Sequence, residues 1–156
     1  ETGGCFSSLS YSYGAHGVEV EVDTETGQIR LLNVVSVNDP GKAINPQMVV
    51  GQIQGTIVQS QGWALLENFV TEGGYIQTDT LSTYLIPTVL DIPDREKTIL
   101  LEKPDPLGPY GVRGVGEIPF VSLPPAVVSA VHNATGVWFD HLPLRPQDVA
   151  AALQST

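Results

Sequence analysis

An alternation of valine and glutamate near the start of the chain most constrains its fold. Over residues 17–22 the two residue types take turns after Gly17, so one face of this segment is apolar and the other is acidic. A period of two predicts a β-strand with one buried face. A turn at residues 23–27 and a second β-rich run at 28–37 complete a predicted hairpin, which ends at the Asn-Asp-Pro-Gly sequence of residues 38–41.

A helix of unusual composition follows the hairpin. Asn45 is a good N-cap and Pro46 suits the first helical position, and apolar residues then recur at helical spacing through about Asn68. Glycine inside a helix costs about 1 kcal/mol relative to alanine. The stripe opposite the apolar face nevertheless contains two glycines. They indicate close approach either to another backbone, as in tight helix-on-sheet packing, or to a ligand. The stripe consists of Gln52, Gly55, Gln59 and Gly62.

The rest of the chain predicts a second hairpin, a short strand, a loop and two further helices. In chain order, the hairpin turns at 72–74, the strand covers 98–101, the loop covers 103–113, and the helices cover 124–136 and 146–153. Neither a repeat nor a linker interrupts the pattern. We therefore expect a single α+β domain over residues 1–156, with β-hairpins packed against a long central helix and two C-terminal helices.

Composition argues against several classes of function. The net charge of −10 disfavours nucleic acid and anionic membranes as partners, since both require basic side chains to bind phosphate. No apolar run approaches the roughly 20 residues of a membrane-spanning helix, and no signal peptide opens the sequence. Cys5 is the lone cysteine, which leaves no thiolates for a disulfide, an iron–sulfur cluster or a zinc site. We expect a reducing compartment, the cytoplasm.

The histidines do not suggest a metal site either. His16, His132 and His141 lack the spacing of metal ligands. We interpret them as ordinary surface or core residues, and we expect no metal ligand from this chain.

A carboxylate behind a Gly-x-Gly turn is the strongest candidate for chemistry. Gly114, Val115 and Gly116 directly precede Glu117, and neither glycine has a Cβ that would keep a ligand away from the backbone. A glutamate held at the edge of a dry pocket can act as a general base. Taken alone, such a turn is more often a solvated loop.

Four segments in order resemble the C-terminal part of the molybdenum-cofactor subunit of the xanthine dehydrogenase and aldehyde oxidase family, the molybdenum hydroxylases. The order and spacing fit across nearly the whole chain, with departures at Thr56, Ser60, Gln61 and Ile118. The segments are residues 20–23 with 26–27, 39–41 with 44–46, 51–55 with 64–67, and 114–117 with 142–146.

The resemblance implies roles for residues in the two glycine-containing segments. Gln52 matches the glutamine that hydrogen-bonds molybdopterin, and Glu117 matches the glutamate that acts as base at the molybdenum while a heterocycle or an aldehyde is oxidised. The glycines would let backbone amides approach the anionic pterin ligand. Besides Gln52, the implied cofactor-binding residues are Gly51, Gly55, Gly114, Val115 and Gly116.

The resemblance also implies partners. The cofactor subunit of the family is several times longer than this chain and holds the cofactor between two halves. We therefore expect a truncated or separately encoded piece that supplies one wall of the site, holds no cofactor alone and is inactive alone. The expected partners are the rest of the molybdenum subunit, iron–sulfur and flavin subunits, or a second copy, because uncovered apolar surface favours association.

Two alternatives remain open at this point. The chain could be a non-catalytic orphan domain that keeps the fold as a binding module without cofactor. It could also be an unrelated acidic α+β binding protein.

Overall fold

The first predicted hairpin supplies two strands of the main sheet. The computed structural model describes residues 10–155, so Cys5 lies outside the described residues. Strands β1 (Tyr13–Val22) and β2 (Ile29–Asp39) pair antiparallel, with a bulge between Glu19 and Val20. The valines of β1 are half-buried and its glutamates are exposed, which confirms the face predicted from the alternation.

The third strand of this sheet pairs in parallel. Strand β5 (Arg95–Leu100) lies beside β2, so the strand order is β1-β2-β5. A parallel neighbour requires a crossover connection, and helix α1 (Pro46–Leu65) provides it. The sequence predicted a strand here, at residues 98–101, but not its partner.

Helix α1 begins as predicted and ends three residues earlier than predicted. The side chain of Asn45 accepts a hydrogen bond from the N–H of Met48 at 3.1 Å, and Pro46 is the first helical residue. At the other end, the N–H groups of Leu66 and Glu67 both donate to the carbonyl of Gly62. These two bonds tighten the last turn and stop the helix before Asn68.

Helix α2 (Ile118–Thr135) corrects the prediction that a helix starts at Pro124. It begins six residues earlier, directly after Glu117, and includes Pro124 and Pro125 in its interior. Proline lacks an N–H, so two intrahelical hydrogen bonds are lost. Burial of the apolar face on α1 and β1 offsets that loss, and Gly136 ends the helix at φ +78° as predicted.

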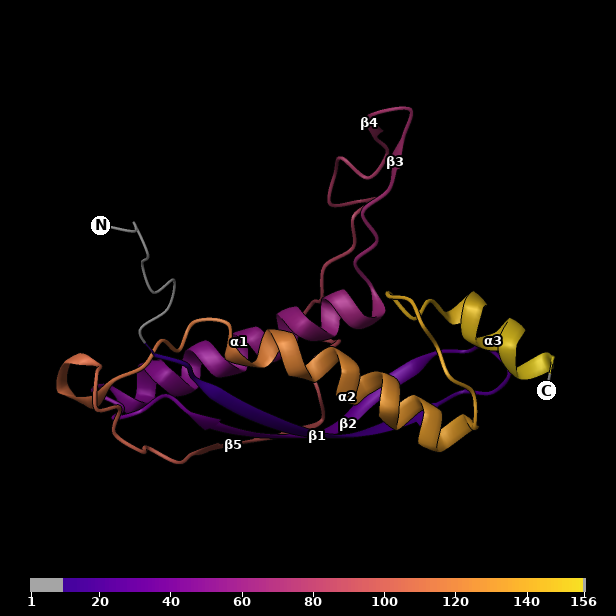
Figure 1. Cartoon of the computed structure of the whole chain (residues 1–156). Helices are drawn as coiled ribbons and strands as arrows, with labels where there is room; N and C mark the ends of the chain where they lie inside the picture. The colour runs from indigo at the N-terminus through magenta and orange to yellow at the C-terminus, as the bar shows by residue number, and fades with distance from the viewer. Residues whose placement is uncertain (1–9, 156) are drawn as a thin grey trace, which may run out of the picture.

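The core lies between the sheet and the two long helices, which run side by side over one face of the sheet (Figure 1). Helix α3 (Pro146–Gln154), also as predicted, closes one end of this core. The fold is the predicted α+β type, with a long central helix and two C-terminal helices. The buried apolar residues are Leu31, Val34, Ile53, Ile57, Ala64, Leu65, Leu123, Val127, Val131, Leu144 and Val149.

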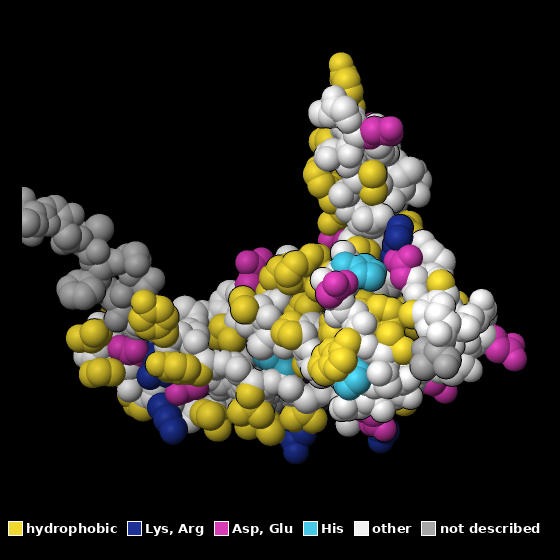
Figure 2. Space-filling model, turned by 45° about the vertical axis from the view of Figure 1, so that its right-hand side comes forward, with side chains coloured by type: hydrophobic (Ala, Val, Ile, Leu, Met, Phe, Trp, Pro, Cys, Tyr) yellow, Lys and Arg dark blue, Asp and Glu magenta, His cyan; other side chains and the backbone are white. Residues whose placement is uncertain are grey.

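The second hairpin does not pack on the body. Strands β3 (Thr71–Glu72) and β4 (Tyr75–Ile76) pair with each other at the end of a projecting segment (Figure 1). We call residues 68–91 the arm. The space-filling view shows it standing clear of the rest of the molecule (Figure 2).

Among residues 10–155, none of the helices has the length and apolar character needed to cross a bilayer.

Candidate functional site

The turn at residues 114–117 lies against the middle of α1. The carbonyl oxygen of Gly116 is 3.2 Å from the hydroxyl of Thr56, which also lies 2.8 Å from the carbonyl oxygen of Gln52 one turn earlier. On the next turn, Nε2 of Gln59 donates to Oε1 of Glu117 at 3.4 Å. Glu117 therefore joins the exposed helix stripe that carries Gln52 and Gln59.

A buried ion cluster fixes the start of this turn. Arg113 donates from Nη1 to Oδ2 of Asp39 at 2.7 Å and from Nε to Oδ2 of Asp105 at 3.0 Å. The guanidinium also lies 5.3 Å from the ring centroid of Tyr13, within the range of a cation–π contact. The three charged side chains are about nine-tenths buried. The loop of residues 103–113, which contains the short helix η1 (Pro109–Gly111), is thereby tied to the end of β2.

Both carboxylates of the cluster are held in the ionised form. Burial works to raise the pKa of Asp39, but hydrogen bonds from Arg113 and from the N–H groups of Gly41 and Lys103 outweigh it and lower that pKa. The hydrogen bond from Arg113 is the main cause that lowers the pKa of Asp105. Carboxylates stabilised in this way anchor the loop over the ordinary pH range.

The glycines of the predicted site face open space. At Gly51, Gly55, Gly114 and Gly116 an added Cβ would meet no atom within 4 Å. At Gly62, by contrast, an added Cβ would lie 2.7 Å from Cδ of Pro87. The close approach inferred for the glycine stripe therefore occurs within this chain at Gly62. The neighbour there is Pro87, which belongs to a loop rather than to the sheet. Nothing within residues 10–155 approaches Gly55.

The backbone of the turn carries free hydrogen-bond donors. Within residues 10–155, the backbone N–H groups of Gly114, Val115 and Gly116 donate to no carbonyl or side chain. The turn leads directly into α2, whose N-terminus carries a partial positive charge. Free N–H groups at a helix N-terminus are suited to an anionic ligand.

A partly buried hydrogen-bond chain links the hairpin to α2. His16 of β1 is 2.8 Å from the hydroxyls of both Ser36 and Ser122, through Nε2 and Nδ1 respectively, and burial lowers its pKa. The amide of Asn38 donates to Ser36 at 2.8 Å. Because Ser122 belongs to α2, this chain joins both strands of the hairpin to the helix that begins after Glu117.

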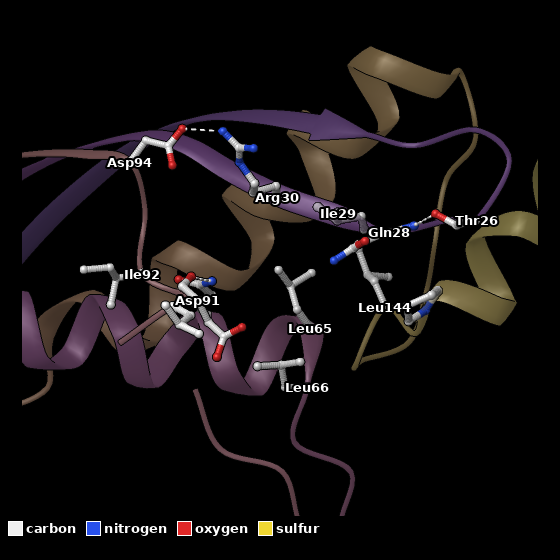
Figure 3. Close-up of a pocket in the computed structure, with 13 residues that line it drawn as sticks. Thr26, Gln28, Ile29, Arg30, Leu65, Leu66, Asp91, Ile92, Asp94 and Leu144 are labelled. Atoms are coloured by element: carbon white, nitrogen blue, oxygen red, sulfur yellow. Dashed lines mark hydrogen bonds and ion pairs between the residues drawn. The ribbon is translucent and has the colours of Figure 1, made fainter. Parts of the chain in front are cut away.

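A separate cavity of about 330 Å³ lies at the other end of α1 (Figure 3). Arg30 and Asp94 form an ion pair at its edge, 2.6 Å apart, while Gln61 donates to the carbonyl of Asp91 beside it. The cavity contains none of the sequence-predicted site residues. Within the described residues, no group of three His, Cys, Asp or Glu side chains is placed to hold a metal ion.

Comparison with known proteins places the chain in a family. The sequence of residues 1–93 matches the molybdopterin cofactor-binding domain. The chain belongs to this family. The resemblance inferred from the four sequence segments is therefore confirmed. The matched residues include α1 with Gly51 and Gly55, whereas the turn at residues 114–117 lies beyond them.

Individual relatives extend the similarity beyond residue 93. A probable xanthine dehydrogenase subunit from Bacillus subtilis (strain 168) is 38% identical over 143 residues, which is 92% of this chain and 19% of the relative. The crystal structure of quinoline 2-oxidoreductase from Pseudomonas putida 86 matches with a TM-score of 0.85 and 39% identity, over 92% of this chain and 19% of that one. The aldehyde oxidoreductase from Desulfovibrio gigas matches with a TM-score of 0.83 and 35% identity, over 92% and 15%.

This molybdopterin cofactor-binding domain spans about a fifth of the length of the relatives it matches. Its residues fit the cofactor in two respects. The bare glycine backbone leaves room for a flat ring system beside α1, and the unpaired N–H groups of the turn suit an anionic group. Helix α1 carries no cation, since neither Lys nor Arg occurs between Lys42 and Arg95.

The residues that position the turn were not predicted from the sequence. Arg113 entered the sequence analysis only as the last residue of the loop at 103–113, and Asp39 only as part of a strand breaker, although their ion pair joins positions 74 residues apart. A lone arginine in a loop rich in glycine and proline was the available signal. Thr56 was noted only as a departure from glycine, and its contact with Gly116 explains its place on the helix.

Proposed function

We propose that this chain forms one wall of a molybdopterin site in an oxidoreductase of the xanthine dehydrogenase and aldehyde oxidase type. In this proposal Glu117 is the catalytic base and Gln52 hydrogen-bonds the cofactor. The surrounding contacts come from Gly51, Gly55, Gly114, Val115 and Gly116. The names of the relatives, a probable xanthine dehydrogenase subunit and an aldehyde oxidoreductase, support this class of reaction.

The observation that carries the proposal is the contact between the turn and α1. The hydrogen bonds of Thr56 to Gly116 and of Gln59 to Glu117 put the carboxylate on the same exposed face as Gln52 and Gly55. A proton acceptor, an amide and bare backbone thus share one open surface. That arrangement suits a base beside a bound planar ligand.

The residues around the site have separate tasks in the proposed reaction. The bound molybdenum cofactor supplies the two-electron redox chemistry. Glu117 accepts a proton on a carboxylate oxygen, and the amide of Gln59 orients that carboxylate. The ion pairs of Arg113 keep the turn in place, so the carboxylate does not have to be ordered when substrate arrives.

The site needs a second wall. Glu117 and Gln52 are exposed in this chain, and a base works best where water is excluded. We propose that further polypeptide of a molybdenum subunit covers the face, together with iron–sulfur and flavin modules that carry the electrons away.

Co-expression tests this function. The chain should be produced with large-subunit polypeptides of its source organism, and the purified complex assayed for molybdenum by elemental analysis and for oxidation of heterocycles and aldehydes. Glu117→Gln should abolish turnover while the molybdenum content stays nearly unchanged. Glu25→Gln, which changes another exposed carboxylate, should leave both unchanged.

Two results would contradict the proposal. Turnover that survives Glu117→Gln excludes this residue as the base. If no polypeptide yields molybdenum or activity, the chain is instead a non-catalytic module of the same fold.

A further inference from the structure

The arm combines exposed apolar side chains with acidic ones. Its exposed apolar side chains include Leu81, of which 72% is exposed, and Leu90, of which 91% is exposed. Hydrophobic side chains are visible along the arm and at its tip (Figure 2). Its charged residues are Glu72, Asp79 and Asp91, all acidic, and it contains no basic residue. The arm is therefore both apolar and anionic.

The hairpin at the end of the arm gains little stability from its own pairing. Its strands have two residues each and are joined through Gly73 and Gly74, both with positive φ. An isolated two-stranded hairpin is marginal in water even when it is longer. A contacting surface would add to the stability of this one.

The base of the arm, in contrast, is firmly attached to the body. The hydroxyl of Tyr84 donates to Glu67 at 2.5 Å, Pro87 packs on Gly62, and the carbonyl of Asp91 accepts from the buried side chain of Gln61. These three contacts fix the returning part of the arm, residues 84–91, to the last turns of α1 and the residues just after it. They direct it away from the sheet rather than along the body (Figure 1).

We propose that the arm inserts into an apolar cleft bordered by lysine and arginine side chains, on polypeptide outside these 156 residues. The apolar side chains fill the cleft, and the exposed carboxylates of Glu72 and Asp79 pair with the basic rim. The inference rests on the proposed function only for the choice of partner, which is the remainder of a molybdenum subunit.

A second copy of the chain fits the arm poorly. The chain has seven Lys and Arg residues against 17 Asp and Glu. Four of its basic side chains already contact carboxylates, namely Arg30, Lys42, Arg113 and Arg145. Two such chains would bring acidic surfaces together, which is unfavourable.

Binding measurements with matched variants test the proposal. The co-expressed large-subunit polypeptide should be purified and its dissociation constant for the chain measured at low and high salt. Leu81→Ser with Leu90→Ser should weaken binding about tenfold or more, because apolar burial is lost. Glu72→Lys with Asp79→Lys should weaken it about tenfold or more at low salt and less at high salt, because salt screens the rim charges.

The controls carry the same chemical changes away from the arm. Leu107→Ser alters another largely exposed leucine, and Glu19→Lys with Glu25→Lys alters two exposed glutamates. These variants should bind within about twofold of the unaltered chain. Circular dichroism should show the same fold in every variant, since none of the altered side chains belongs to the core.

Several outcomes would overturn the proposal. Arm variants that bind as tightly as the controls exclude the arm as the contact. The proposal would also be overturned by self-association through the arm or by arm-dependent binding to phosphatidylcholine vesicles. Failure of every large-subunit polypeptide to bind the chain would overturn it as well. A complex that depends on the arm but lacks molybdenum would leave the arm proposal standing and contradict the function. If the arm variants load molybdenum as well as the unaltered chain does, the arm proposal is contradicted and the proposed function stands.

Discussion

Nη1 of Arg113 lies 2.7 Å from Oδ2 of Asp39, so the last residue of β2 holds the residue that precedes Gly114. Through this pair the position of the turn depends on the sheet rather than on the loop alone. The loop of residues 103–113 is otherwise irregular apart from η1. A firmly placed turn is what a proton acceptor at a fixed distance from its substrate requires.

Replacing Arg113 should strongly destabilise the chain. Arg113→Met keeps most of the side-chain volume but leaves the buried carboxylates of Asp39 and Asp105 unpaired, which is costly. We expect the urea midpoint to fall by roughly 1 M or more, as followed by circular dichroism. Arg95→Met changes an exposed arginine of β5 and should have little effect. Equal midpoints for the two variants would show that the cluster contributes nothing.

The same cluster should make the chain sensitive to acid. The folded pKa values of Asp39 and Asp105 lie below their ordinary value of 3.8, so the ionised forms favour the folded state. Their contribution is complete above that value and is lost as the pH falls below it. Urea unfolding at a series of pH values should show a drop in stability below about pH 4. Asp105→Asn should reduce the slope, and an unchanged slope would contradict the assignment.

His16 should make the stability of the chain depend on pH in a second, higher pH range. Burial lowers its folded pKa below the ordinary value of 6.5, so the neutral form favours the folded state. Stability should be constant above that pH and should decrease as the pH falls from 6.5 toward the folded pKa. His16→Gln removes the titration and should flatten this part of the profile. A slope that persists in the variant would assign it to other groups.

Two of the glycines of α1, Gly55 and Gly62, should respond oppositely to alanine. Gly55→Ala adds a methyl group where nothing lies within 4 Å, and it should raise the free energy of unfolding by about 0.5–1 kcal/mol, because alanine favours the helix. Gly62→Ala forces a Cβ against Pro87 and Glu67 and should lower it by about 1–3 kcal/mol. Urea unfolding of both variants checks the difference. Similar values would mean that Pro87 moves aside freely.

Local patterns predicted the elements whose cause is local. The valines of β1, the cap at Asn45 and the left-handed Gly136 follow from neighbouring residues alone. The predicted start of α2 was wrong. Pro124 is a good first residue of a helix in isolation, but packing of Leu123 and Val127 continues the helix through it. Pro119, in the first turn, was the better signal.

Long-range contacts could not be predicted from sequence spacing. The pairing of β5 with β2 joins Asn33 to Arg95, and the contact of Thr56 with Gly116 joins positions 60 residues apart. Sequence spacing alone does not reveal either. The roles of Gln52 and Glu117 at the cofactor were accordingly implied by family resemblance rather than by spacing, and they stay a proposal.

The place of the arm in the chain has a further consequence. The arm interrupts the connection between α1 and β5, yet it leaves and returns at the same end of α1, where Glu67 contacts Tyr84 and Gln61 contacts Asp91. Its length is therefore independent of the distance that the crossover must span. Evolution or a protein engineer can lengthen, shorten or replace this segment, and so change what the molecule recognises, while the sheet and the turn before Glu117 keep their geometry.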